Sequence, residues 1–130
     1  MLMINVFLVD DQESVRRGLK MRLALEEDLQ VVGEAADSKR ALDLIQELKP
    51  DVVIMDVEMP GMDGISTTFA LHDVAPQIKV VLLSLHNNPF LRDRAFIAGA
   101  SAFVEKRGGA VNLLNEIRNA CEINRRKNYG

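Results

Sequence analysis

Four apolar runs of this sequence each end on residues that can take part in chemistry. The residues at these ends are Asp10 and Asp11, Asp56, Ser84, and Lys106. If they met in the fold, three carboxylates, one hydroxyl and one ammonium would share one site. Clustered carboxylates raise one another's pKa values unless a cation lies among them. Mg²⁺ suits such a site, because it binds one or two carboxylates together with water and phosphoryl oxygens.

The same groups match what phosphoryl transfer requires, namely an aligned nucleophile and neighbours that neutralise charge. Each residue also has a purely structural explanation. Either member of the aspartate pair could cap a helix, and Asp56 could be a turn residue. Ser84 could satisfy local backbone groups, and Lys106 could be one solvated cation among sixteen basic residues. Their joint position at strand ends favours the chemical explanation.

The elements that must position these residues alternate along the chain. The apolar runs expected to be strands are Ile4–Val9, Leu29–Val32, Asp51–Met55, Lys79–Leu83 and Ser101–Glu105. The segments with helical periodicity are Ser14–Leu25, Ala41–Leu48, Ile65–Asp73, Pro89–Ala98 and Val111–Cys121. Unbroken apolar runs indicate strands buried on both faces, so we expect a doubly wound α/β domain with a parallel sheet. Functional residues gather at the carboxyl ends of such strands.

Local signals place some of the helix ends. Asp37 or Ser38 is a plausible N-cap of the second helix, because both residue types accept hydrogen bonds from exposed helical N–H groups. Pro50 stops that helix. Gly99 is well placed to adopt a left-handed conformation after the fourth helix.

The composition is that of one globular domain. The chain has 130 residues and a formal net charge of −3, which gives no general attraction to nucleic acid or anionic membrane. No stretch approaches the ~20 apolar residues of a membrane span, and the first residues lack signal-peptide features, so a cytoplasmic protein is expected. The single cysteine, Cys121, is expected to be buried. We expect one domain over residues 1–123, with residues 124–130 as a tail or the start of a linker.

The strand-end residues lie in segments that resemble the receiver domains of bacterial response regulators. The matching segments are Val9–Asp11, Asp51–Gly64 (DVVIMDVEMPGMDG), Leu83–Ser84 and Ala102–Lys106 (AFVEK). The resemblance runs from about Ile4 to Ile123 and implies the flavodoxin-like (βα)5 fold with strand order 2-1-3-4-5. His86 and the stretch Lys106–Gly109 (KRGG) are similar to the LuxR/NarL-type group.

This resemblance implies a phosphoacceptor and a metal site. Asp56 is expected to take a phosphoryl group from a sensor histidine kinase of a two-component system. Asp11, Asp56 and the backbone carbonyl of Glu58 are expected to bind Mg²⁺, and Asp10 to act through a bound water. Apart from its own phosphotransfer and dephosphorylation, no enzymatic activity is expected.

The resemblance also implies groups that respond to the phosphoryl group. Ser84 and Lys106 are expected to contact phosphoryl oxygens. Phe103 matches the aromatic switch of the family, although an aromatic residue in an apolar strand is ordinarily a core residue. Two departures leave the phosphoryl lifetime open. Leu85 stands where many receivers have a small residue, and Glu58 lies near the path of an attacking water.

The expected output surface is the face of the fourth helix, fifth strand and fifth helix, where a homodimer can also form. DNA would be contacted only through a separate output domain, which the LuxR/NarL-like details favour over a stand-alone receiver. Two further alternatives are an aspartate-nucleophile phosphohydrolase and a receiver-like module that is not phosphorylated. The first would carry a second aspartate in place of Glu58 and a cap insertion. The second usually loses an acidic residue or the lysine, and this chain keeps them.

Overall fold

The computed structural model describes the backbone of residues 2–61 and 63–129, with side chains as far as residue 122. Within these residues, the strands are β1 (Ile4–Val9), β2 (Leu29–Ala35), β3 (Val52–Asp56), β4 (Lys79–Ser84) and β5 (Ala102–Glu105). The helices are α1 (Glu13–Leu23), α2 (Ser38–Leu48), α3 (Gly64–Val74), α4 (Pro89–Ile97) and α5 (Ala110–Tyr129), with a short 3₁₀ helix, η1 (Lys106–Gly108), before α5. Strands and helices alternate as the periodicity predicts.

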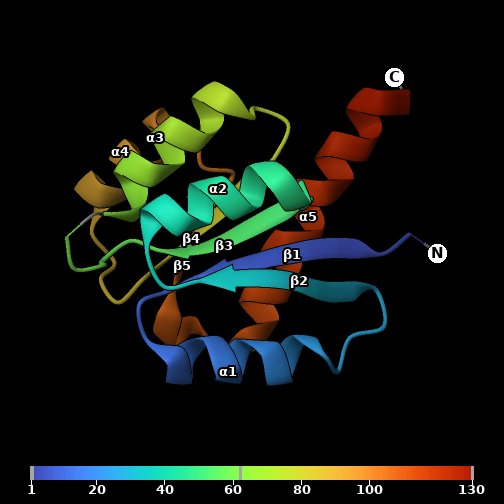
Figure 1. Ribbon diagram of the computed structural model, residues 1–130, viewed down its shortest axis with the longest axis horizontal. Helices are drawn as coiled ribbons and strands as arrows, with labels where there is room; N and C mark the ends of the chain where they lie inside the picture. The colour runs from blue at the N-terminus through green and yellow to red at the C-terminus, as the bar shows by residue number, and fades with distance from the viewer. Residues whose placement is uncertain (1, 62, 130) are drawn as a thin grey trace.

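The strands form one parallel sheet in the order β2-β1-β3-β4-β5, which confirms the expected doubly wound arrangement (Figure 1). β1 lies inside the sheet and pairs with both β2 and β3. The register places Asp56 beside Leu83, and Ser84 beside Glu105. The carboxyl ends of β3, β4 and β5 therefore lie next to one another.

Helices cover both faces of the sheet (Figure 1). α2, α3 and α4 lie on one face, whose core includes Phe7, Met55 and Leu82. α1 and α5 lie on the other face, whose core includes Leu23 and Ile117. Successive side chains of a strand point to opposite faces, so the inner strands of a sheet covered on both sides are largely buried on both faces. This is why β1, β3 and β4 read as unbroken apolar runs.

β2 is longer than the apolar run Leu29–Val32 predicts, because it continues to Ala35. It is an edge strand with one neighbour, and its middle residues are only partly buried. Polar and small residues are therefore tolerated there, and they end the apolar pattern before the strand ends. Gly33 is one of them, and a Cβ at this position would lie 2.8 Å from the Phe7 ring.

The helix ends follow the expected signals. The N-cap of α2 is Asp37, whose side chain accepts a hydrogen bond from the Arg40 N–H, so Ser38 is the first helical residue. Asp63 caps α3 in the same way through the Ser66 N–H. Gly99 follows α4 with a φ of 110°, which confirms its predicted positive φ.

The last helix, α5, covers residues 110–129 as one backbone helix, and in Figure 1 its final turns extend past the sheet. The segment expected to be a tail or linker is thus helical as far as Tyr129, and the division at residue 123 stays a prediction. Cys121 is buried on α5, as expected. No helix among the described residues has the length and apolar character needed to cross a membrane.

Candidate functional site

Three aspartates meet at the carboxyl ends of β1 and β3. Asp10 and Asp11 directly follow β1, Asp56 is the last residue of β3, and these strands are paired. One carboxylate oxygen from each of the three lies within 4.8 Å of the others. Asp10 and Asp56 are 2% and 4% exposed. This compact set of oxygen donors fits a hard divalent cation such as Mg²⁺.

Lys106 supplies positive charge to this cluster from the end of β5. Its Nζ lies 3.0 Å from Asp56 Oδ2 and 3.5 Å from Asp10 Oδ2. The side chain is 17% exposed, so the alternative of a solvated surface cation is wrong. The structure thus brings together the acidic residues and the lysine that sequence spacing placed at strand ends.

Burial and charge oppose each other in the protonation of this pair. Burial raises the pKa of Asp56, and it outweighs the lowering effect of Lys106 and of the Glu58 N–H. Burial also acts to lower the pKa of Lys106, but Asp56 and Asp10 raise it above its ordinary value. Lys106 is therefore held in its charged form. Asp56 still lacks enough positive charge to offset its burial, which a bound cation would provide.

Ser84 is the last residue of β4 and is fully buried. Its hydroxyl lies 3.0 Å from Glu58 Oε1 and accepts a hydrogen bond from the His86 N–H at 3.1 Å. The structural explanation that serine satisfies local backbone groups is therefore partly correct. The contact with the Glu58 carboxylate was not expected from the sequence.

The loop after β1 is held by hydrogen bonds to Asp10. Its Oδ1 accepts from the Gln12 N–H at 2.9 Å, and its backbone carbonyl accepts from Arg16 at 2.6 Å. Arg16 also forms an ion pair with Glu34 of β2 at 2.8 Å. The N-cap of α1 is Gln12, without a side-chain cap bond, so the alternative that one of the paired aspartates caps this helix is wrong.

Sequence reasoning missed Arg16 as a positioning residue. An arginine six residues after Asp10, within an amphipathic helix, is an ordinary feature of such a sequence. The pairing of Arg16 with Glu34 becomes visible only when α1 and β2 are known to be neighbours.

Gly64, the first residue of α3, lies unusually close to the Asp56 backbone. Its N–H donates to the Val57 carbonyl at 2.9 Å. A Cβ at this position would lie 2.2 Å from the Asp56 carbonyl oxygen, far inside van der Waals contact. Glycine is therefore required here for α3 to begin so near the site.

The remaining predicted residues have defined positions but untested roles. Phe103 is 7% exposed in the core on the α2–α4 face, so its action as a switch stays a prediction. Leu85 is 49% exposed, and its effect on the phosphoryl lifetime stays open. The ligand role of the Glu58 carbonyl also stays a prediction.

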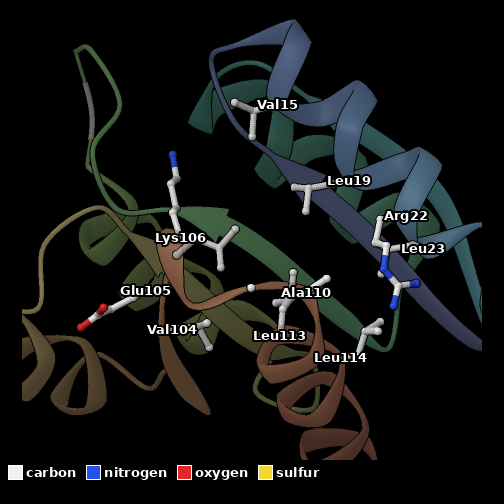
Figure 2. A pocket seen from close by; sticks show the side chains of 12 residues that line it. Val15, Leu19, Arg22, Leu23, Val104, Glu105, Lys106, Ala110, Leu113 and Leu114 are labelled. Atoms are coloured by element: carbon white, nitrogen blue, oxygen red, sulfur yellow. The ribbon is translucent and has the colours of Figure 1, made fainter.

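A cavity of about 350 Å³ lies beside the site, between α1 and α5 (Figure 2). Its walls are mostly apolar and include Val15, Leu19 and Leu113. Figure 2 shows the ammonium end of Lys106 directed away from α5. The cavity and the acidic cluster therefore share Lys106 as a boundary while differing in polarity.

Comparison with known proteins supports a family assignment. Residues 6–118 match the model of the response regulator receiver domain. The response regulator GacA of Pseudomonas aeruginosa is 42% identical over 116 residues, which cover 89% of this chain and 54% of that protein. The chain thus spans about half the length of this curated relative.

Solved structures give the same assignment. The receiver domain of the putative regulator NarL from Mycobacterium tuberculosis has a TM-score of 0.88 and 31% identity, covering 94% of this chain and 98% of that one. RcsB from Salmonella enterica serovar Typhimurium has a TM-score of 0.81 and 28% identity, covering 88% of this chain and 66% of that one. The RcsB structure is bound to a promoter in the presence of phosphomimetic BeF₃⁻.

Proposed function

We propose that this chain, which belongs to the response regulator receiver family of two-component signalling, is a switch that accepts a phosphoryl group on Asp56. The observation that carries the proposal is the surroundings of Asp56 at the end of β3. Its carboxylate lies 3.0 Å from Lys106 and within 4.8 Å of the carboxylates of Asp10 and Asp11. Members of this family are signalling proteins rather than classical enzymes. Similar solved structures include receivers of the LuxR/NarL-type group.

In the proposed reaction, a carboxylate oxygen of Asp56 attacks the phosphorus of a phosphohistidine on a sensor kinase. A new O–P bond forms while the P–N bond breaks, and the electron pair of that bond returns to the imidazole nitrogen. The product is an acyl phosphate on Asp56. Lys106 is already 3.0 Å from the nucleophile, so its charge is in place to offset the charge of the incoming phosphoryl oxygens.

Mg²⁺ is the cofactor that the oxygen donor set fits. Asp11, Asp56 and the Glu58 carbonyl would hold it, with Asp10 acting through water. When bound, it supplies positive charge to the carboxylates and to the phosphoryl oxygens. Ser84 would donate its hydroxyl proton to a phosphoryl oxygen. Phe103 would turn inward as Ser84 moves toward that oxygen.

The proposed output surface is formed by α4, β5 and α5. Exposed apolar side chains on this part of the molecule support the proposal: Phe90 and Ile97 of α4 are 70% and 84% exposed, and Val111 of α5 is 69% exposed. Apolar groups in contact with water favour association. A homodimer through this face is one form that the output can take.

Control of transcription is the proposed outcome of the switch. The curated relative GacA is about twice as long as the matched region, and RcsB is described with a promoter. We place the receiver at residues 1–123, followed by a linker to an output domain that would contact DNA. The net charge of −3 gives the receiver itself no general attraction to DNA phosphates.

Incubation with acetyl phosphate and Mg²⁺, followed by intact mass measurement, tests the phosphoacceptor. Wild type should gain the mass of one phosphoryl group. The control Asp93→Asn, which changes an exposed residue of α4, should gain the same mass. Asp56→Asn should gain none. An adduct that persists in Asp56→Asn, or that fails to form on wild type, contradicts the proposal.

A further inference from the structure

We propose that Glu58 is a positioning residue whose carboxylate holds the Ser84 hydroxyl in a resting position and competes with the phosphoryl group for it. The inference deepens the proposed function and rests on it, because it assumes that Ser84 donates to a phosphoryl oxygen. Its basis is the 3.0 Å contact between Ser84 Oγ and Glu58 Oε1. This bond joins the loop after β3 to the end of β4.

Glu58 contacts both groups that must act on the phosphoryl group. Its backbone N–H donates to Asp56 Oδ1 at 3.2 Å, and its side chain reaches Ser84. Ser84 is fully buried at the end of its strand, whereas Glu58 is exposed on its loop. The carboxylate can therefore move into solvent without disturbing the core, while Ser84 can change its partner only within the site.

The Ser84 hydroxyl has a single proton to donate. Two acceptors lie in reach, the Glu58 carboxylate at 3.0 Å and the His86 carbonyl at 3.1 Å. A charged acceptor forms the stronger hydrogen bond, so the proton is directed to Glu58. The His86 N–H also donates to the hydroxyl oxygen. The only proton of the Ser84 hydroxyl is thus engaged, and Ser84 must release Glu58 before it can donate elsewhere.

A phosphoryl group on Asp56 would change this balance in two ways. Its oxygens are negatively charged acceptors that compete for the same proton, and their charge repels the Glu58 carboxylate. Donation to the phosphoryl group then frees Glu58 and breaks the link between the loop and β4. Because the free energy of that link is lost on activation, Glu58 lowers the affinity of the site for the phosphoryl group.

The first measurement needs no phosphorylation. Amide chemical shifts of the metal-free protein are compared for wild type, Glu58→Ala and Glu58→Gln. The His86 N–H donates to Ser84 Oγ, so its shift reports on the hydroxyl. Glu58→Ala should move the His86 and Ser84 signals. Glu58→Gln should keep them near wild type, because its amide oxygen can still accept the proton. Unmoved signals in Glu58→Ala overturn the inference.

The second measurement is the apparent Kd for beryllofluoride in the presence of Mg²⁺. Glu58→Ala should bind about three- to tenfold more tightly than wild type, the range expected for a charged hydrogen bond weakened by exposure. Glu58→Gln should lie between them. The matched control is Glu105→Gln, which removes one negative charge beside Ser84 on the neighbouring strand. Figure 2 shows the Glu105 side chain directed away from that of Lys106.

The outcomes separate this inference from the proposed function. If wild type accepts no phosphoryl group from acetyl phosphate, the proposed function fails. If wild type is phosphorylated but Glu58→Ala binds beryllofluoride no more tightly, only the role of Glu58 fails. Equal gains in Glu58→Ala, Glu58→Gln and Glu105→Gln would assign the effect to net charge and likewise overturn the role of the hydrogen bond.

Discussion

Lys106 offsets the charge of two buried carboxylates, Asp10 and Asp56. Replacing it with methionine preserves much of the apolar stem and removes the charge. We expect Lys106→Met to lower the free energy of unfolding at neutral pH by about 2–3 kcal/mol without divalent ions, because a buried carboxylate loses its partner. Urea denaturation in EDTA measures this loss. Added Mg²⁺ should restore part of it, since a second cation can neutralise the cluster.

The control for this change is Lys39→Met, on the exposed surface of α2. It removes the same charge without leaving a buried carboxylate, and we expect a change below about 0.5 kcal/mol. Equal losses in the two variants would show that Lys106 does not stabilise the acidic cluster.

At the scale of single residues, much of the site could be predicted. The sequence predicts the positions of Asp10, Asp56 and Lys106, because each lies at the end of an apolar run and parallel strands end at one edge of the sheet. The hydrogen-bond partner of Ser84 could not be predicted from the sequence. The bond to Glu58 depends on which way a loop side chain turns across a separation of 26 residues, and local sequence carries no signal for that choice.

The junction between β3 and α3 requires glycine at position 64, because there is no room for a side chain there. A Cβ on Gly64 would lie 2.2 Å from the Asp56 carbonyl oxygen, which belongs to backbone and cannot turn aside. We expect Gly64→Ala to lower the free energy of unfolding by about 3 kcal/mol or more, because the start of α3 must shift. Urea denaturation measures the loss, and acetyl phosphate labelling should slow as Asp56 is displaced.

Gly18→Ala is the matched control, in the interior of α1 with no heavy atom within 4 Å of the added Cβ. We expect it to stabilise the protein by about 0.5–1 kcal/mol, since alanine favours a helix over glycine. If both alanine variants had similar stability, the close approach at Gly64 would not limit the fold.

The ion pairs of Glu34 connect β2 to α1. Hydrogen bonds from Lys20 and Arg16 lower the pKa of Glu34 below its ordinary value of 4.5. A carboxylate with a lowered folded-state pKa stabilises the fold above its unfolded pKa, and the stabilisation disappears as pH falls through the folded value. We expect Glu34→Gln to cost about 1 kcal/mol at pH near 7, and the difference from wild type to shrink on acidification below 4.5.

Urea denaturation over this pH range checks the prediction, with Glu13→Gln as control. Glu13 pairs with Arg17 across one turn of α1, and its side chain is 74% exposed. Its replacement should change stability little at any pH. A Glu34→Gln effect that grows on acidification would contradict the assigned direction of the pKa shift.

At the scale of elements, periodicity predicted the order of strands and helices, and it failed where burial is incomplete. The predicted strand Leu29–Val32 was shorter than β2 because small and polar residues such as Gly33 and Glu34, which ended the apolar run, are allowed in an edge strand. The predicted helix Val111–Cys121 was shorter than α5, because the apolar periodicity fades toward the end of α5 while the backbone remains helical. Hydrophobic patterns report packing, so they underestimate elements that extend beyond the core.

For the whole molecule, composition and periodicity predicted the doubly wound class, but the strand order came from the resemblance to receiver domains. Pairing of β1 with both β2 and β3 is a long-range property. No local pattern in Ile4–Val9 states which strands lie on either side. The sheet shows that order directly, and the TM-score of 0.88 to a solved receiver domain agrees with it.

The positions of the site residues along the chain also bear on how the protein folds. The carboxylates of Asp10, Asp11 and Asp56 belong to the first half of the chain, whereas Lys106 follows the last strand. Pairing of β1 with β3 is enough to bring the carboxylates together, so a folding path that pairs these strands before β5 docks would gather negative charge without Lys106. We expect Mg²⁺ to speed refolding of wild type in stopped-flow circular dichroism more than NaCl of equal ionic strength. Equal rates would mean that the carboxylates meet only after β5 has docked.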